Sequence, residues 1–154
     1  RARYGIGHFG DNFSLTFIYV NSSGTSHTAQ CAFAAMLGAA ADGLYDFVDN
    51  MREYGRRAAR VKDAFRANGF HLVYDKDLDE EVSDGFFFTV GYPGKTGSEL
   101  LLGLLRCGVC AITLTSTRST REGIRVCVSL MKSEDDFVRL ERGLERFREL
   151  YGTA

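Results

Sequence analysis

The sequence has few cysteines and no long apolar run, and each shortage excludes a class of protein. Four cysteines in 154 residues are too few for a disulfide scaffold of this size, and several lie in apolar runs, as reduced core cysteines do. No apolar run is long enough to span a membrane, and no signal peptide opens the chain. We therefore expect a cytoplasmic protein.

The sequence also lacks an excess of either charge. It has 19 Lys and Arg against 20 Asp and Glu, for a net charge of -1, and 45% of its residues are hydrophobic. This composition excludes a disordered chain and a strongly basic nucleic-acid-binding protein. The length is that of one ordinary domain with a real core. Because the chain begins with Arg1 rather than Met, we expect it to be a piece of a longer protein.

One stretch, 122–130, has the pattern of a half-buried strand. Aliphatic residues at every second position alternate with Arg125, Cys127 and Ser129. A guanidinium within a strand needs a partner, and its planar fork suits a carboxylate or a phosphate. An edge-strand arginine paired with an Asp or Glu of its own domain is the simpler interpretation of the pattern alone.

The first part of the chain predicts an extended segment and then two helices. Residues 1–20 contain three early glycines and then the strand formers of 14–20. Gly5–Gly10 matches the glycine pattern of dinucleotide-binding loops, but no strand precedes it and no helix pattern follows, so we reject a nucleotide site. The alanine-rich stretch 27–41 predicts a well-buried helix, and 44–67 predicts a long amphipathic one. Its basic residues are interleaved with acidic ones, which indicates a solvated face.

The remainder predicts a small sheet with further helices. Strands are expected at 70–74, 85–90 and 109–115, besides the arginine strand, with an acidic loop at 75–84. A capping box at Thr96–Glu99 opens one helix, and Ser133–Asp136 cap a final one. We therefore predict an α/β fold, more narrowly an α+β two-layer fold, with about four strands covered on one side by helices.

Other possible chemical motifs have structural explanations. Cys107-Gly108-Val109-Cys110 straddles a helix end and a strand start, whereas a redox pair begins a helix, so structural cysteines are the better interpretation. No second cysteine pair completes a zinc site. The three histidines accompany no recognisable nucleophile, which leaves no catalytic triad to argue.

Four segments, in order, resemble the C-terminal half of a fold-type I, class I/II pyridoxal-phosphate-dependent aminotransferase. Residues 21–30 resemble the family's serine/asparagine turn and the glutamine-bearing helix after it. Gly85–Phe88 resembles its glycine-aromatic strand, and Leu104–Val109 resembles its turn into the next strand. Gly123–Ser129 resembles the strand whose arginine binds the substrate carboxylate. The resemblance divides the chain into 1–20, the end of the large cofactor-binding domain, and 21–154, the small domain.

The resemblance assigns roles to individual residues. It implies that Arg125 binds the α-carboxylate of the amino acid or 2-oxo acid substrate, in agreement with the bidentate geometry of a guanidinium. Arg3 resembles the arginine that binds the cofactor phosphate after the family's Schiff-base lysine. Asn21 and Ser22 belong to the turn that approaches the partner subunit's cofactor phosphate. The implied partners are the substrates, the chain's own large domain and a second copy in a homodimer, with no nucleic acid and no membrane.

The resemblance also implies that this segment is inactive alone. The lysine that binds pyridoxal 5'-phosphate is expected just upstream of Arg3, and the aspartate and aromatic residue that hold the pyridine ring are expected in the large domain. The four lysines present occupy helix, loop or strand-end positions that do not fit that role. Ile112–Thr115 stands where many members have a Pro-Gly turn, so the substrate subgroup stays open. The expected enzyme is the parent protein, a transaminase of amino acid metabolism and biosynthesis.

Two other functions fit the same residues. One is a stand-alone module that binds a carboxylate or phosphate through Arg125 together with Arg118 or Arg121. The other is a structural or dimerisation domain, which the alanine-rich helix and the many aromatic residues favour.

Overall fold

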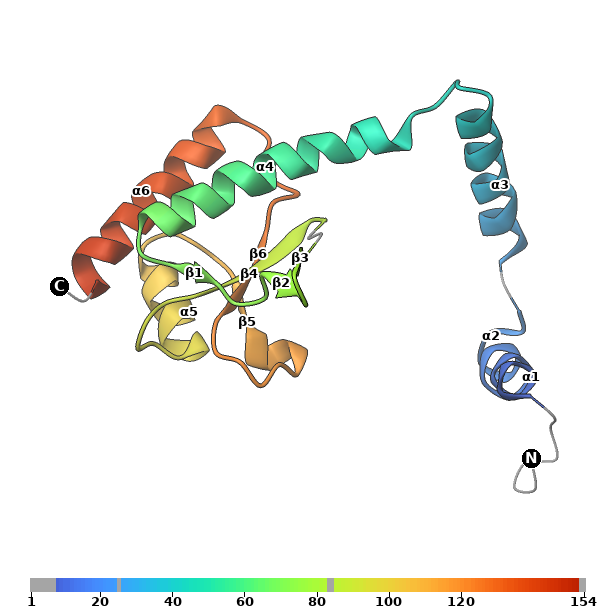
Figure 1. Ribbon diagram of the computed structural model, residues 1–154, viewed down its shortest axis with the longest axis horizontal. Coiled ribbons are helices and arrows are strands. Elements are labelled where there is room, and N and C mark those ends of the chain that lie inside the picture. The colour runs from blue at the N-terminus through green and yellow to red at the C-terminus, as the bar shows by residue number, and fades with distance from the viewer. Residues whose placement is uncertain (1–7, 25, 83–84, 153–154) are drawn as a thin grey trace. The chain divides into compact units, whose positions relative to one another are not determined.

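The computed structural model describes residues 8–24, 26–82 and 85–152, without the side chains of residues 12, 16 and 50. The chain divides into two compact units, Arg1–Phe47 and Val48–Ala154. Figure 1 labels their helices and strands.

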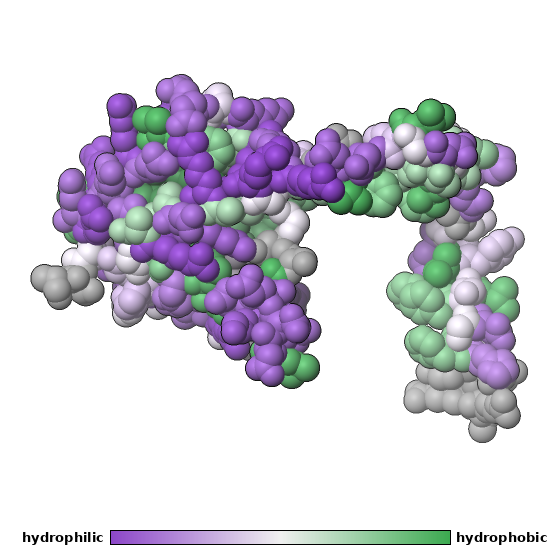
Figure 2. All heavy atoms as spheres, turned by 45° about the horizontal axis from the view of Figure 1, so that its top comes forward, coloured by the Kyte–Doolittle hydropathy of each residue, from purple (hydrophilic) through white to green (hydrophobic). Residues whose placement is uncertain are grey.

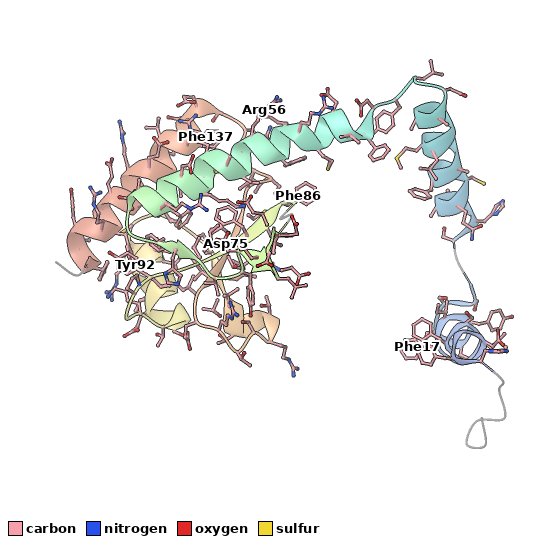
Figure 3. All side chains as sticks on the ribbon, in the orientation of Figure 1. Phe17, Arg56, Asp75, Phe86, Tyr92 and Phe137 are labelled. Atoms are coloured by element: carbon pink, nitrogen blue, oxygen red, sulfur yellow. The ribbon has the colours of Figure 1, made fainter. Side chains whose placement is uncertain are left out.

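The first unit is helical. Helix α1 (Phe9–Asn12), the π-helix η1 (Phe13–Tyr19) and helix α2 (Val20–Ser22) follow one another without a break, and α3 spans His27–Ala41. The expectation of an extended segment at 1–20 is therefore wrong for residues 9–20, whereas residues 1–7 lie outside the described residues. The helical backbone places aromatic residues four apart on one side, where the rings of Phe13 and Phe17 stack at 5.4 Å. Figure 3 labels Phe17 on this segment.

Helix α3 forms where it was predicted, but it is not buried. None of its side chains is buried, and Phe33 is 58% exposed. Ser26 caps its N-terminus by accepting a hydrogen bond from the Ala29 N–H at 3.4 Å. In Figure 2, hydrophobic residues are exposed along the helices of this unit. The helix thus forms from local propensity, and burial does not follow from its apolar composition.

The second unit is built on a four-stranded antiparallel sheet. Its strands are β1 (His71–Leu72), β4 (Phe87–Gly91), β6 (Ile124–Cys127) and β5 (Ile112–Thr113), in that spatial order. The short strands β2 (Lys76–Asp77) and β3 (Glu80–Glu81) form a separate two-stranded sheet within the predicted acidic loop. The predicted strand at 109–115 is reduced to β5, because the 3-10 helix η2 (Leu114–Thr117) follows at once.

Three helices cover one face of this sheet. They are α4 (Phe47–Ala67), α5 (Gly97–Arg106) and α6 (Glu134–Tyr151), and α4 and α6 run side by side in Figure 1. Arg60 of α4 joins Glu134 of α6 at 2.5 Å, and its guanidinium lies 4.1 Å from the ring centre of Phe137, beside α4 in Figure 3. The predicted α+β two-layer fold is confirmed.

The core lies between the helices and the sheet. Phe65 of α4, Leu104 of α5 and Phe147 of α6 are fully buried against Phe88 and Ile124 of the sheet. The predicted capping box of Thr96 with Glu99 is present, and the predicted cap at Ser133 is also a capping box, with Asp136. Leu130, expected on the buried face of the arginine strand, is instead 77% exposed, because β6 ends at Cys127.

Candidate functional site

The sheet face opposite the core carries the residues that the sequence singled out. Strand pairing sets Thr89 opposite Arg125 and Phe87 opposite Cys127, and on the other side Ile112 opposite Arg125. Because side chains alternate between the faces of a strand, all five lie on the side away from buried Phe88 and Ile124. We call these five residues the outer face.

Arg125 lies in the interior of the sheet rather than at its edge. Its strand β6 is flanked by β4 and β5, and the guanidinium carbon stands 4.4 Å from the ring centre of Phe87. This stacking holds the guanidinium plane over an apolar surface and leaves its N–H groups to other acceptors. Within the part of the chain that the structure describes, no carboxylate forms an ion pair with it, although several surface arginines have such partners.

The nearest acidic residue along the chain is already used elsewhere. Glu122 accepts a hydrogen bond from the Gly97 N–H at 2.6 Å, at the start of α5. Gly123 stands between Glu122 and the strand with a φ of 143°, a conformation that favours glycine. A Cβ there would lie 2.6 Å from the Val90 carbonyl oxygen. The interpretation of Arg125 as an edge-strand arginine paired within its own domain therefore does not hold among the described residues.

A groove of about 500 Å³ contains Arg125. It opens where β5 stops: residues 108–111 do not pair with β6, so a space remains between them and Val126–Cys127. Hydrophobic side chains from β6 and the helices line much of it, among them Phe65, Val126 and Leu140. An arginine beside an apolar wall can bind the carboxylate of a small organic acid.

The other charged residues of the groove have local partners. Asp136 accepts hydrogen bonds from Ser133, which hold the pKa of its carboxyl below the ordinary value, with the Lys132 backbone N–H adding to the effect. Arg139 pairs with Asp135, one turn away on α6. None of the described residues that line the groove is a lysine. Among the described residues, Arg125 is thus the charged side chain of the groove that has neither an ion-pair partner nor a hydrogen-bond partner.

The two arginines considered as helpers of Arg125 lie in the loop before β6. Arg121 donates to the Val73 carbonyl oxygen at 2.7 Å, and its guanidinium stacks at 4.8 Å on the ring of Tyr74. The Tyr74 hydroxyl is in turn 2.7 Å from Ser119 Oγ. Arg118 ends η2 with a φ of 65° and does not line the groove. The structure does not bring either one into the groove beside Arg125.

The candidate cofactor residues belong to the first unit. Arg3 lies outside the described residues. Asn21 Nδ2 donates to the Phe17 carbonyl oxygen and Ser22 Oγ to that of Ile18, both at 2.6 Å, and both side chains are exposed. Each therefore bonds to its own helix one turn back. Arg125 belongs to the other unit.

The cysteines are less buried than expected, because several of them were predicted to lie in the core. Only Cys107 is buried, whereas Cys31, Cys110 and Cys127 are exposed free thiols. Cys107 follows the last residue of α5 and packs in the core, so a structural role suits this cysteine of the C-x-x-C motif but not exposed Cys110. No group of three or more metal-ligating side chains occurs among the residues whose positions are described.

Sequence reasoning found Arg125 but missed the groove and Phe87. The alternation of Phe86, Phe87 and Phe88 contained a usable signal, because the middle ring must face away from its two neighbours. Figure 3 shows Phe86 near α4, and its ring meets that of Tyr54 edge-on at 4.5 Å. The register that sets Phe87 beside Arg125 follows only from strand pairing.

The comparisons add no family to this description. The sequence matches no model of a known protein family and no curated protein. In the described ranges, no helix is both long and apolar enough to cross a membrane.

Proposed function

We propose that 21–154 is the small domain of a pyridoxal-phosphate-dependent aminotransferase and that Arg125 binds the substrate α-carboxylate. The parent protein would transfer an amino group between an amino acid and a 2-oxo acid in cytoplasmic amino acid metabolism. Its partners would be these substrates, its own large domain including 1–20, and a second copy in a homodimer. The order of the four resembling segments supports the assignment.

One observation carries the proposal: Arg125 is held in place but has no carboxylate partner among the described residues. A guanidinium partly withdrawn from water needs acceptors, and packing on Phe87 supplies none. A substrate carboxylate would complete the site by accepting two parallel N–H bonds from the fork. Because β4 and β5 both pair with β6, the backbone of Arg125 is fixed, so the fork is positioned before the substrate arrives.

The described residues do not by themselves form a site for the cofactor. The side chains of Asn21 and Ser22 bond to their own helix, and the Arg125 groove has no lysine to form a Schiff base. When bound, pyridoxal phosphate supplies a ring that accepts electrons from the substrate. The residues that hold it, apart from the phosphate contacts expected of Arg3, Asn21 and Ser22, would come from the large domain. This segment would therefore orient the substrate and be inactive alone.

The test uses the complete coding sequence that contains these residues. We expect it to encode a lysine within about a dozen residues upstream of Arg3, and the protein to transfer amino groups to 2-oxoglutarate when pyridoxal phosphate is supplied. Arg125→Gln should lose about 3 kcal/mol of carboxylate binding, which is about 10²-fold in kcat/KM. Arg139→Gln is the matched control, because Arg139 lines the same groove but pairs with Asp135.

Two results would reject the proposal. One is a complete protein without an upstream lysine, and the other is an Arg125→Gln enzyme as active as Arg139→Gln. Carboxylate binding that needs Arg125 in a protein without transaminase activity would favour the stand-alone binding module. A tight dimer that binds no small acid would favour the dimerisation domain.

A further inference from the structure

The groove beside Arg125 contains two free thiols on opposite walls. Cys110 lies on the segment that leads into β5, and Cys127 is the last residue of β6. Both are exposed, and both line the groove. Neither has a role in the function proposed above.

The strand register places these two cysteines opposite each other. Ile112 pairs with Arg125 and Thr113 with Ile124, so each step back along β5 is a step forward along β6. If the ladder continued, Ala111 would face Val126 and Cys110 would face Cys127. Since side chains alternate, Cys110 would then lie on the outer face with Ile112, and Cys127 is already there.

The Cα spacing of such a pair falls within the range of disulfides. The Leu114 N–H donates to the Gly123 carbonyl oxygen, which marks that pair as hydrogen-bonded. Hydrogen-bonded pairs recur at every second step, so Cys110 and Cys127 would form another, with Cα atoms about 5.5 Å apart. Disulfides join cysteines whose Cα atoms are about 4.4–6.8 Å apart and whose Cβ atoms are about 3.5–4.5 Å apart. The Cβ atoms of a hydrogen-bonded pair are about 5.5 Å apart, so the bond would be strained and readily reduced, as a reversible disulfide is.

Little of the chain has to move to extend the ladder. The Val109 N–H donates to the Leu104 carbonyl oxygen at 2.9 Å, and Cys107 is buried in the core, so the segment is anchored up to Val109. Only Cys110 and Ala111 separate this anchor from the paired residue Ile112. The gap in the ladder is thus two residues long, and both of these residues line the groove.

We propose that Cys110 and Cys127 form a reversible disulfide with a small-molecule disulfide of the glutathione type as oxidant. One cysteine thiolate attacks the oxidant, forms a mixed disulfide and releases one small thiol. The other cysteine attacks the mixed disulfide, forms the Cys110–Cys127 bond and releases the second small thiol. The two cysteines lose two electrons and two protons in total, and the oxidant gains both. The bond lengthens β5 to Cys110 and narrows the groove next to Arg125.

The first test is a disulfide map of the chain after incubation with oxidised glutathione. We expect an intramolecular product that has lost two hydrogens, a cross-linked peptide joining Cys110 to Cys127, and full recovery of both thiols with a reductant. Cys31→Ser is the matched control and should form the same bond, whereas Cys110→Ser and Cys127→Ser should not. Circular dichroism checks that each variant is folded. A bond between Cys107 and Cys110, a persistent mixed disulfide or no reaction would overturn the proposal.

The second test asks whether the bond extends the sheet. Amide hydrogen exchange should slow at Cys110 and at Cys127 in the oxidised chain and recover on reduction, because both residues occupy a hydrogen-bonded ladder position. If the exchange rates of these two amides are the same in the oxidised and reduced chains, the inference that the disulfide extends β5 and narrows the groove is wrong. Neither test depends on transaminase activity, so the inference stands or falls separately from the proposed function.

Discussion

Both units of the chain contain helices rich in apolar residues. Among the described residues, only the helices of the second unit bury their apolar side chains. In the first unit, Phe33 and Leu37 of α3 are 58% and 46% exposed. In the second, Phe65, Leu104 and Phe147 have no exposed surface. The difference shows that a high apolar content does not by itself bury a helix. A core forms only where the apolar faces of several elements pack against one another.

The patterns of α3 and α4 explain this difference. Helix α3 has no Asp, Glu, Lys or Arg, so its sequence defines no polar side. Helix α4 separates buried residues such as Val61 and Phe65 from a charged side that includes Arg56 and Asp63. A helix with one apolar face can close a two-layer domain, whereas a helix that is apolar all round needs neighbours on every side.

The largest expected effect is at the centre of the core. Phe65→Ala should lower the free energy of unfolding of the second unit by about 3–5 kcal/mol, because it removes the contacts of Phe65 with Phe70 and Phe88 and leaves a cavity. Phe33→Ala in α3 should change it by no more than about 0.5 kcal/mol. Urea denaturation of the full chain measures both. Equal effects would mean that the two units share one cooperative core.

Two glycines in helices should respond in opposite directions to the same substitution. A Cβ at Gly143 of α6 would lie 2.7 Å from Val109 Cγ2 and 2.9 Å from the Cys107 carbonyl oxygen, whereas one at Gly55 of α4 meets nothing within 4 Å. Gly143→Ala should therefore destabilise the unit by about 1–3 kcal/mol. Gly55→Ala should stabilise α4 by about 1 kcal/mol through helix propensity. Thermal unfolding gives both signs, and a stable Gly143→Ala variant would contradict the close packing of α6 on Cys107.

The helix caps of the two units offer a smaller contrast. Ser133→Ala removes the cap of α6 and should lower the free energy of unfolding of the second unit by about 1 kcal/mol. Ser26→Ala removes the cap of α3, which contributes no core residue, so it should reduce helical circular dichroism without moving that unfolding transition. A shift of the transition by Ser26→Ala would show coupling between the units.

The smallest expected effect is a dependence on pH. Hydrogen bonds from Ser133 lower the pKa of Asp136, and those from Thr96 lower the pKa of Glu99, in the folded state. The resulting stability is fully present above the ordinary values of 3.8 and 4.5 and is lost as the pH falls through the lowered values.

The check compares the chain with the double variant Glu99→Gln and Asp136→Asn. Urea midpoints measured from pH 7 down to pH 3 should fall less steeply for the variant on the acid side. Helix α3 has Ala29 at the corresponding capping position, so its helicity should lack this acid transition. If the urea midpoint fell equally steeply with pH in both proteins, the two capping boxes would not control the loss of stability in acid.

Local signals explain which parts of the fold were predictable. The boxes at Thr96 and Ser133 fall within four residues each, so the sequence alone locates the starts of α5 and α6. The strand formers at 14–20 were misleading, because β propensity depends on a sheet to pair with, and these residues form helix instead. The point at which β5 ends could not be predicted from the sequence either. It depends on how Cys107 and Val109 are anchored to α5.

The candidate site shows the same limit. Alternation along 124–128 was enough to set Arg125 on the face opposite the core. Its position within the sheet, its stacking on Phe87 and the engagement of Glu122 with Gly97 all involve segments far apart in the chain. The resemblance to aminotransferases named the same arginine, and the assignment of its ligand stays a prediction.

The sequence by itself determined helices α3 to α6, the caps of α3, α5 and α6, and the two-faced pattern of the arginine strand, because these depend on residues within one or two turns of each other. The tertiary structure alone decided which apolar helix is buried, where β5 stops and what surrounds Arg125. Those outcomes depend on strand register and on the packing of segments such as Cys107–Val109 against α5 and α6. Hydrophobic periodicity in a single sequence indicates local secondary structure and does not indicate long-range contacts of this kind.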